Sequence, residues 1–285
     1  MIREGLTQLN GKRVYIERLQ DKVYTITEVE EVLYQGKSPY QLIEVTRDIY
    51  GKTLYLDHST QVASEDEYVY HEAFAHPPLI VHENPRKILI IGGGDGGLLR
   101  EVLKHDIVEE AVLVEIDKMV IEVVEKYLPE IPSGSFQHPK ARIIIGDGLV
   151  FLEETEEKFD IIFIDVTDDV ESPFHTEKYV SLMKKCLKEG GILVFQSLGV
   201  FEHKGAQKKI LKVLEKFFKN TGVYVVYVPS FNGLWSFTYA SDKYSLEEIT
   251  PEIIEERLKK RKVKTRFYTP KAHQLLFLSS LYLNL

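Results

Sequence analysis

The sequence contains a single cysteine, no long run of apolar residues and no excess of positive charge. One cysteine, Cys186, allows neither an internal disulfide bond nor a Cys-x-x-Cys metal site, which suits a reducing compartment. No apolar run reaches the length of a membrane-spanning helix, and residues 1–5 lack the apolar segment of a signal peptide. We therefore expect a cytoplasmic protein that does not enter a membrane.

Acidic residues outnumber basic ones. The chain has 44 Asp and Glu against 36 Lys and Arg, which gives a formal charge of -8 at pH 7. This balance argues against a nucleic-acid-binding protein, which would present a basic surface, and is compatible with a cationic substrate. With 285 residues, of which 44% are hydrophobic, the chain is long enough for one large domain or two unequal ones.

The first part of the chain has the pattern of strands and turns. From residue 12 to about residue 62, short runs rich in Val, Ile, Tyr and Thr are separated by glycine, proline and aspartate, which predicts a small antiparallel sheet. A capping-box pattern at residues 64–67 then predicts the start of a helix. We expect Pro77 and Pro78 to end that helix.

Beyond residue 85, buried strands alternate with amphipathic helices, which is typical of a parallel, doubly wound sheet. We predict strands at residues 87–91, 111–115, 142–145, 160–164, 192–196 and 223–227, and helices at residues 119–127, 177–187 and 205–218. The charged run at residues 247–262 predicts a further, solvated amphipathic helix. The chain is therefore divided into an N-terminal β-strand domain, residues 1–62, and a Rossmann-like α/β domain, residues 63–285.

An apolar strand at residues 88–91 leads directly into a glycine-rich turn that contains a carboxylate. Gly92, Gly94 and Gly97 satisfy G-x-G-x-x-G, the pattern of a dinucleotide site, although this pattern alone is weak evidence. Asp95, within the turn, would repel a phosphate group. The turn is therefore better suited to a nucleoside that carries a cationic group, and an ordinary dinucleotide site is the alternative.

Four successive strands end in an acidic residue. Ligands of such sheets bind at the carboxyl ends of the strands, where this sequence has Asp95, Glu115, Asp147 and Asp165. A single acid at such a place commonly caps the next helix or faces water, but four in register predict a binding crevice. Glu115 follows Gly97 by 18 residues, close to the spacing of an acid that binds ribose hydroxyl groups.

Asp147 lies between two glycines, which leave room for a flat ring such as adenine. Ribose and adenine without a phosphate site indicate a ligand of the adenosylmethionine type. Residues 165–169 add further carboxylates, including Asp168, and such crowding requires a cation or proton uptake. A metal ion is one candidate, but the loop lacks the spaced oxygen ligands of an EF-hand and His175 has no partner at metal-ligand spacing. We predict no metal site and favour a polyamine.

Most of the chain resembles the polyamine aminopropyltransferases, the spermidine synthase family. The matching segments are residues 41–45, Gln61, and residues 67–72, 92–97, 114–117, 146–148, 165–168, 233–237 and 268–273. The resemblance implies a small β domain before a seven-stranded, methyltransferase-type sheet. It also implies transfer of an aminopropyl group from decarboxylated S-adenosylmethionine to an amine, with release of methylthioadenosine. The donor is then a co-substrate, and no other cofactor is expected.

The resemblance assigns roles to individual residues. It implies that the donor is held by Gln41, Gln61, Gly92, Gly94, Asp95, Glu115, Asp117, Asp147 and Gly148. The acceptor amine would meet Tyr70, His71, Asp165, Asp168, Phe231 and Trp235. Asp165, helped by Tyr70, is expected to take the proton of the attacking amine. Without the resemblance, Tyr70 and His71 would be interpreted as packing residues on a helix, and Trp235 as a core or rim aromatic residue.

Two departures from the family pattern concern the acceptor side. After Asp168 the family usually has Asp-Pro-x-Gly-Pro-Ala, whereas residues 169–174 here are Asp-Val-Glu-Ser-Pro-Phe and the segment is shorter. Phe231 stands where the family usually offers a tyrosine hydroxyl group. Putrescine is the first expected acceptor, but these changes leave open a broad or different specificity for cadaverine, agmatine or spermidine.

Two functions outside aminopropyl transfer also remain open. One is an S-adenosylmethionine-dependent amine methyltransferase, which would need a cation near Asp95 for the carboxylate of its cofactor. The other is a non-catalytic nucleoside-binding protein of the same fold. The resemblance further implies a homodimer or homotetramer, because the family is commonly dimeric or tetrameric.

Overall fold

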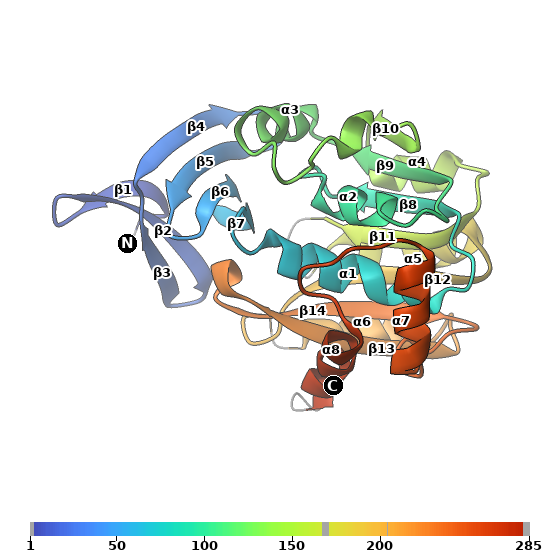
Figure 1. Cartoon of the computed structure of the whole chain (residues 1–285). Coiled ribbons are helices and arrows are strands. Elements are labelled where there is room, and N and C mark those ends of the chain that lie inside the picture. Colours follow the sequence, from blue (N-terminus) through green and yellow to red (C-terminus); the bar gives the residue numbers. More distant parts are fainter. Residues whose placement is uncertain (1–2, 167–170, 204, 282–285) are drawn as a thin grey trace.

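Two small antiparallel sheets form the N-terminal part of the protein (Figure 1). The structure is a computed structural model and describes residues 3–166, 171–203 and 205–281. The first sheet contains β1 (Gly5–Leu9), β2 (Lys12–Gln20) and β3 (Val23–Glu28), and the second contains β4 (Glu31–Lys37), β5 (Leu42–Asp48), β6 (Gly51–Leu56) and β7 (Ser59–Ala63).

The antiparallel pairing is as predicted, but the strands form two sheets where we expected one. The chain changes sheet at two consecutive residues. The N–H of Val29 donates to the carbonyl of Arg13 in the first sheet, and the N–H of Glu30 donates to the carbonyl of Arg47 in the second, both at 2.9 Å. Strand patterns alone contain no signal for this change of partner.

A seven-stranded sheet forms the centre of the larger part, with the order β10-β9-β8-β11-β12-β14-β13. Its strands are β8 (Lys87–Gly92), β9 (Glu110–Glu115), β10 (Ala141–Ile145), β11 (Phe159–Asp165), β12 (Leu187–Gly199), β13 (Asn220–Val228) and β14 (Gly233–Ser241). Neighbouring strands are parallel except that β14 is antiparallel to both of its neighbours. The seven-stranded α/β fold class and the six predicted strands are confirmed, although β12 and β13 extend beyond the predicted bounds at both ends.

Helices cover both faces of this sheet (Figure 1). They are α1 (Glu67–Val81), α2 (Gly97–Leu103), α3 (Lys118–Tyr127), α4 (Gly148–Glu154), α5 (Glu177–Cys186), α6 (Ala206–Leu214), α7 (Pro251–Lys260) and α8 (Pro270–Leu281), with short 3-10 turns at Ser135–Gln137, Pro173–His175 and Pro229–Phe231. Side chains of α1, α2, α7 and α8 belong to one apolar core, and those of α4, α5 and α6 to the other. Among the described helices, none is long and apolar enough to cross a membrane.

Helix α1 continues through Pro77 and Pro78, so the prediction that this pair ends the helix is wrong. A proline at position 78 has no N–H to donate to the carbonyl of Phe74. The hydroxyl group of Tyr224, on β13, donates to that carbonyl at 3.4 Å. The whole second half of the helix is buried, so tertiary contacts override the local cost of the two prolines.

The charged segment at residues 247–262 contains α7, as predicted, but it is not wholly solvated. Arg257 donates to two backbone carbonyls and Arg261 donates to three, all within residues 79–83. These carbonyls belong to the end of α1 and the residues after it, where a helix leaves its last acceptors without partners. The two guanidinium groups therefore cap α1 from another part of the chain.

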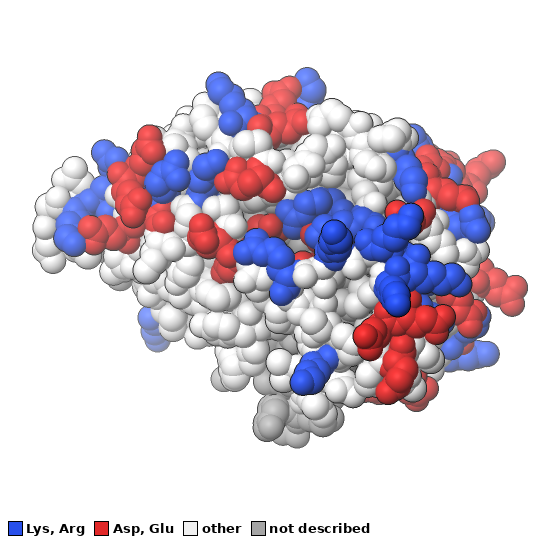
Figure 2. All heavy atoms as spheres, in the orientation of Figure 1, with Lys and Arg blue, Asp and Glu red and all other residues white. Residues whose placement is uncertain are grey.

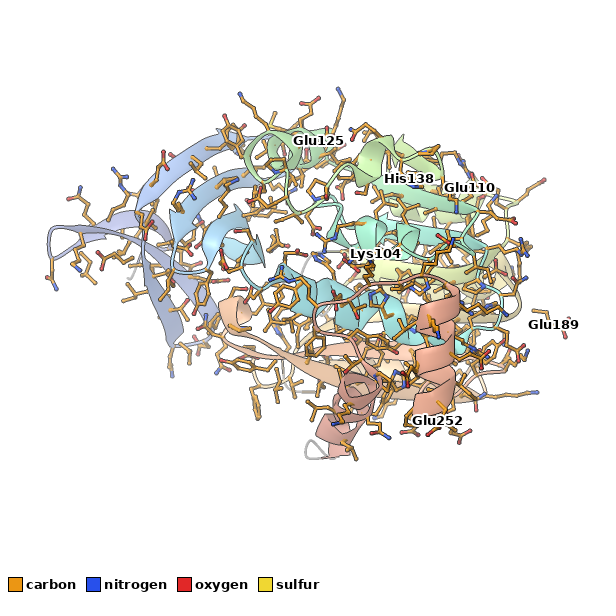
Figure 3. All side chains as sticks on the ribbon, viewed as in Figure 1. Lys104, Glu110, Glu125, His138, Glu189 and Glu252 are labelled. Atoms are coloured by element: carbon orange, nitrogen blue, oxygen red, sulfur yellow. The ribbon has the colours of Figure 1, made fainter. Side chains whose placement is uncertain are left out.

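Charges of both signs cover the surface. On the face shown in Figure 2, Lys and Arg side chains lie beside Asp and Glu side chains over much of the area. Lys243 and Glu83, for example, form an exposed ion pair at 2.7 Å. Figure 3 shows Glu189 and Glu252 at the rim of the molecule, pointing away from it. Exposed pairs of this kind add little to stability, so these charges chiefly keep the surface hydrated.

The strand order changes direction between β8 and β11. From β8 the chain continues to β9 and β10 on one side, and it later returns to β11 and β12 on the other. Gly92, at the end of β8, pairs with Asp165, at the end of β11, and the N–H of Gly93 donates to the carbonyl of Asp165 at 3.0 Å. Open α/β sheets bind their ligands at such a switch point.

Candidate active site

A cavity of about 610 Å³ opens at the carboxyl ends of the parallel strands. Most of the residues predicted from the sequence line it: Gln41, Gln61, Tyr70, Gly92, Gly94, Asp95, Glu115, Asp147, Gly148, Asp165, Phe231 and Trp235. The remaining lining includes residues of β6 and β7, the segment at residues 172–174, and the ends of the parallel strands. The four strand-end acids therefore meet in one crevice, as predicted.

The lining of this cavity carries charge of one sign. Its acids are Asp57, Asp95, Glu115, Asp147 and Asp165, and the described lining residues include no Lys, Arg or His. Carboxylates gathered in one site repel each other unless some take up protons or a cation neutralises them. The cavity therefore favours a cationic ligand.

The glycine turn between β8 and α2 brings backbone and carboxylate close to this cavity. Gly92 has φ of 81°, and a Cβ there would lie 2.0 Å from the carbonyl oxygen of Asp165, so only glycine fits. A Cβ on Gly97 would lie 2.2 Å from the ring of His71. The N–H of Gly97 donates to Oδ1 of Asp95 at 2.6 Å, which fixes that carboxylate at the cavity wall.

Helix capping and cavity lining turn out to be compatible. Asp147 accepts a hydrogen bond from the N–H of Leu149 at 2.7 Å and begins α4, and Asp117 accepts one from the N–H of Met119 at 3.1 Å and begins α3. A carboxylate has two oxygens, so a capping acid retains acceptor capacity for a ligand. Asp147 therefore caps a helix, as an acid after a strand commonly does, and this does not exclude a role in ligand binding.

Asp117 does not belong to the described cavity lining, although we predicted a donor contact for it. Its side chain is buried, and its Oδ2 accepts hydrogen bonds from Oγ of Ser38 at 2.6 Å and from Nε2 of Gln41 at 3.0 Å. Gln41 does line the cavity. The observed geometry gives Asp117 a positioning role, because it holds Gln41 in place.

Asp165 and Tyr70 contact each other next to the glycine turn. Oη of Tyr70, on α1, donates to Oδ1 of Asp165, at the end of β11, at 2.7 Å. Burial and the carboxylate of Asp95 raise the pKa of Asp165 to about 7, against the lowering effect of the Tyr70 hydrogen bond. A carboxyl group with a pKa near neutrality is suited to accept a proton during a reaction at neutral pH.

Glu115 shows a similar perturbation. Burial raises its pKa to about 7, and the neighbouring carboxylates of Asp117 and Asp95 add to this rise against the hydrogen bond from the N–H of Asp117. The last residue of β9 therefore presents a carboxyl group that is only partly ionised at neutral pH when the cavity holds no ligand.

His71 lies behind Asp95 and does not belong to the described cavity lining. Its Nε2 is 3.2 Å from Oδ1 of Asp95, and its Nδ1 is 2.7 Å from Oε2 of Glu67. Burial lowers the pKa of His71, but the two carboxylates outweigh burial and raise it to about 10. We predicted an acceptor contact for His71 and missed this contact with Asp95. The spacing of Glu67 and His71, one helical turn apart, was the signal for their pairing.

Aromatic rings form the wall next to Asp165. The ring centroids of Phe231 and Trp235 are 4.7 Å apart, and those of Tyr70 and Phe231 are 5.6 Å apart. Nε1 of Trp235 donates to Oε1 of Gln196 at 3.1 Å. Gln196 also lines the cavity. We did not predict it, because our prediction relied on acidic residues at the strand ends and Gln196 carries no charge. Asp168 lies outside the described residues.

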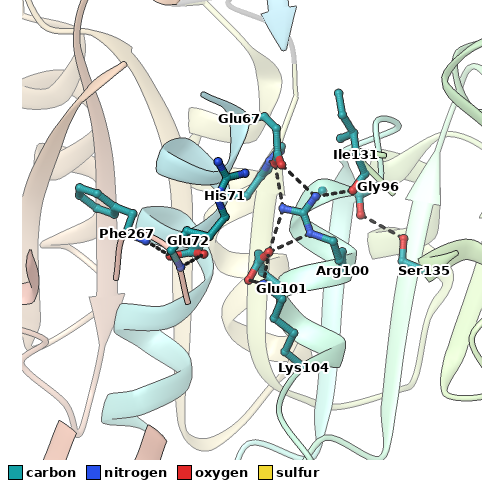
Figure 4. Close-up of polar contacts among 12 residues, drawn as sticks. Glu67, His71, Glu72, Gly96, Arg100, Glu101, Lys104, Ile131, Ser135 and Phe267 are labelled. Atoms are coloured by element: carbon teal, nitrogen blue, oxygen red, sulfur yellow. Dashed lines mark hydrogen bonds and ion pairs between the residues drawn. The ribbon is translucent and has the colours of Figure 1, made fainter. Parts of the chain in front are cut away.

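Glu72, His76 and Glu101 form a buried group with metal-ligand spacing, and none of the three belongs to the described cavity lining. Figure 4 shows the carboxylates of Glu72 and Glu101. The carboxylate of Glu72 accepts hydrogen bonds from the backbone N–H groups of residues 266–268. That of Glu101 pairs with Nζ of Lys104 at 2.7 Å. Oε1 of Glu101 also accepts hydrogen bonds from Arg100 and Lys104, both at 2.8 Å. Groups of the protein therefore already engage both carboxylates, and we assign this group a structural role.

Comparisons with known proteins agree with this geometry. The spermine/spermidine synthase domain matches residues 67–250, and the spermidine synthase tetramerisation domain matches residues 14–64. The chain is 42% identical over 284 residues to the polyamine aminopropyltransferase of Korarchaeum cryptofilum, covering 98% of this chain and 88% of that protein. It is 43% identical over 260 residues to polyamine aminopropyltransferase 1 of Aquifex aeolicus, covering 90% of each.

Two solved structures also match this chain over nearly its whole length. A spermidine synthase in complex with the transition-state analogue AdoDATO superposes with a TM-score of 0.88 at 32% identity, covering 99% of this chain and 98% of that one. The spermidine synthase of Thermotoga maritima gives a TM-score of 0.86 at 32% identity, with the same coverage. With matches over nearly its whole length and an acidic cavity at the switch point, the chain belongs to the spermine/spermidine synthase family.

Proposed function

We propose that this enzyme transfers an aminopropyl group from decarboxylated S-adenosylmethionine to putrescine or a related amine, giving spermidine or a longer polyamine and methylthioadenosine. The observation that carries the proposal is the cavity lining, with five carboxylates and no basic side chain among its described residues. Both proposed substrates are cations. The names of the relatives and the AdoDATO complex of a structural neighbour support the same reaction.

We infer the following contacts between the donor half of the cavity and decarboxylated S-adenosylmethionine. Glu115 would accept hydrogen bonds from the ribose, and Asp147 would accept one from the adenine amino group. Asp95 would face the ammonium group of the aminopropyl arm. Intact S-adenosylmethionine would bring its own carboxylate against Asp95, so the site contains a repulsive element that selects against it. This argues against the methyltransferase alternative.

The Tyr70–Asp165 pair supports catalysis over simple nucleoside binding. In the proposed reaction the amine nitrogen forms a bond to the propyl carbon while the carbon–sulfur bond breaks, and the sulfonium sulfur leaves as a neutral thioether. The acceptor amine, with a reference pKa of roughly 10.4, must lose a proton to attack. Asp165, oriented by Tyr70, would accept that proton. The cavity would align nitrogen, carbon and sulfur for in-line displacement.

Two parallel incubations distinguish the three candidate functions. The protein is mixed with decarboxylated S-adenosylmethionine and a panel of amines, and methylthioadenosine is measured; a parallel reaction contains intact S-adenosylmethionine. Aminopropyl transfer gives methylthioadenosine in the first reaction, whereas a methyltransferase gives S-adenosylhomocysteine in the second. A nucleoside-binding protein gives neither product.

A broad acceptor specificity is the second candidate, and the aromatic wall favours it. Phe231 lines the cavity between Tyr70 and Trp235 and offers no hydroxyl group to a bound amine. We expect kcat/KM values for putrescine, cadaverine, agmatine and spermidine to fall within roughly a hundredfold, about 2.7 kcal/mol in transition-state terms. A larger preference for putrescine would contradict the broad specificity.

The variant Phe231→Tyr provides the matched test of this wall. The added hydroxyl group can bind an amine, so the preference for putrescine over cadaverine is expected to increase by roughly tenfold. Unchanged ratios in the variant would show that Phe231 does not determine acceptor choice.

Donor binding is expected to depend on pH through Glu115. The pKa of Glu115 is raised to about 7 in the free protein, so this carboxyl group is partly protonated at neutral pH. A cationic donor favours the ionised form, so its binding at pH 7 should release roughly half a proton, and its affinity should increase as pH rises through 7. Calorimetry in two buffers with different ionisation enthalpies gives the proton number, and no release at pH 7 would contradict this prediction.

We also infer a homodimer or homotetramer assembled through the N-terminal sheets, working in the cytoplasm without a resident cofactor, nucleic acid or membrane partner. The tetramerisation-domain match at residues 14–64 supports the assembly. Leu9 and Ile26, on β1 and β3, leave 42% and 54% of their surface exposed, which suits a contact between copies.

A further inference from the structure

A line of buried and partly buried charged side chains runs from the cavity wall into the protein. Figure 4 shows three of its members, His71, Glu67 and Arg100. Asp95 is at the wall, and Nε2 of His71 lies 3.2 Å behind it. Nδ1 of His71 lies 2.7 Å from Glu67, whose two carboxylate oxygens accept hydrogen bonds from Arg100 at 3.0 and 2.8 Å. The line therefore alternates between carboxylate and cation over four residues from α1, α2 and the glycine turn.

A carboxylate at the position of Asp95 needs a cation to remain ionised. Its side chain is only 14% exposed, and the carboxyl groups of Asp165 and Glu115 face the same cavity. Burial and like charges both favour the protonated form of such a group. His71 and the N–H of Gly97 reverse the effect of burial and hold the pKa of Asp95 below its usual value.

We propose that His71 is a positioning residue that stays in the imidazolium form, keeps Asp95 ionised, and thereby gives the cavity its preference for a donor without a carboxylate. This role deepens the proposed aminopropyl transfer and rests on it for the identity of the donor. It differs from direct contact with the acceptor, because His71 is separated from the cavity by Asp95.

A second buried histidine, His273, shows how burial changes the pKa of an imidazole that has no carboxylate beside it. His273 is 1% exposed, as is His71, but its ring nitrogens face the hydroxyl group of Tyr268 and the carbonyl of Leu246. Burial lowers the pKa of His273 to about 4. The two carboxylates next to His71 are therefore what distinguishes it from an ordinary neutral core histidine.

Other charged and titratable groups around this line act through Asp95 or Glu67. They are Tyr70 of α1, Arg100 and Glu101 of α2, Glu115 of β9 and Asp165 of β11. Tyr70 contacts the edge of the His71 ring and donates its proton to Asp165, so it does not neutralise Asp95. Arg100 is engaged by both Glu67 and Glu101. His71 remains the cation in contact with Asp95.

The first test measures the charge of His71 in the wild-type protein without any substrate. Nitrogen-15 NMR of the histidine rings distinguishes imidazolium from neutral imidazole. We expect both nitrogens of His71 to remain protonated from pH 6 to 9, while His273 is neutral over the same range. A His71 ring that loses its proton below pH 7 would overturn the proposal. Because no donor is present, this result does not depend on the proposed function.

The second test uses His71→Gln, with His273→Gln as the control for loss of a buried imidazole. Without the imidazolium, burial and the neighbouring carboxyl groups raise the pKa of Asp95, so we expect a larger protonated fraction at pH 7 than at pH 9. The ratio of variant to wild-type Kd for decarboxylated S-adenosylmethionine is then expected to be roughly tenfold or more at pH 7 and to return toward one at pH 9. The control should show no such change with pH.

The outcomes separate this inference from the proposed function. Equal weakening at pH 7 and pH 9 would indicate general damage to the site and would overturn the role of His71. A preference over S-adenosylmethionine that does not narrow in His71→Gln at pH 7 would also overturn it. If the wild-type protein does not bind the donor at all, the proposed function fails, whereas the NMR result on His71 stands on its own.

Discussion

Replacing Asp165 with asparagine is expected to lower the rate of a single turnover by roughly 10²-fold or more while donor affinity changes little. Asparagine keeps the size of the side chain but cannot accept the proton of the attacking amine. The backbone contact from Gly93 to the carbonyl of residue 165 does not involve the side chain, so the glycine turn should stay in place. Rapid-quench measurement of methylthioadenosine, with enzyme in excess over donor, isolates this step.

Asp160→Asn is the matched control for this variant. Asp160 lies on the same strand, is also buried, and accepts hydrogen bonds from the N–H groups of Arg86 and Lys87 at the end remote from the cavity. The Asp160→Asn variant should be less stable than the wild type but should have the same single-turnover rate. Nearly wild-type turnover in Asp165→Asn would show that another group, or water, accepts the proton.

Asp95→Asn is expected to weaken binding of decarboxylated S-adenosylmethionine by roughly tenfold or more and to narrow the preference over S-adenosylmethionine. The variant retains an oxygen for the N–H of Gly97 but loses the negative charge that repels a carboxylated ligand. Calorimetry with both ligands measures the two affinities directly. Unlike the loss of the imidazolium at His71, this loss should not be reversed by raising the pH, because an amide does not ionise.

Asp48→Asn tests whether an aspartate-to-asparagine change is harmful in itself. Asp48 is buried and accepts a hydrogen bond from the N–H of Tyr50, two residues on, as Asp95 does from Gly97. It lies in the second N-terminal sheet and is not part of the described cavity lining. The Asp48→Asn variant should bind both ligands as the wild type does.

Equal binding of the two ligands by the wild-type protein would refute the argument that Asp95 repels the carboxylate of S-adenosylmethionine.

The location of the site follows from the sequence because strand periodicity and the switch-point rule are both local signals. Once residues 87–91 and 160–164 are assigned to parallel strands, Asp95 and Asp165 must emerge at the same edge of the sheet. The structure places both in one cavity. The roles assigned to these residues in the reaction stay predictions until the variants are measured.

Contacts between distant segments could not be predicted in this way. The proline pair in α1 is a strong local signal for a helix end, but tertiary contacts, which bury the second half of α1 and include the hydrogen bond from Tyr224 of β13, let the helix continue. The contact between His71 and Asp95 likewise depends on how α1 packs against the glycine turn. The inward turn of Arg257 depends on the docking of α7, which the charge pattern of that segment does not reveal.

The hydrogen bonds that begin the helices have a consequence for engineering the enzyme. Asp117 and Asp147 each accept a hydrogen bond from a backbone N–H at the start of a helix, so a substitution that removes this acceptor costs roughly 1 kcal/mol of stability in addition to any loss of binding. Phe231 and Trp235 face the cavity with aromatic rings and begin no helix. A mutant library directed at these two caps would therefore lose stability as well as binding, whereas one directed at the aromatic wall would leave the hydrogen bonds that begin α3 and α4 intact.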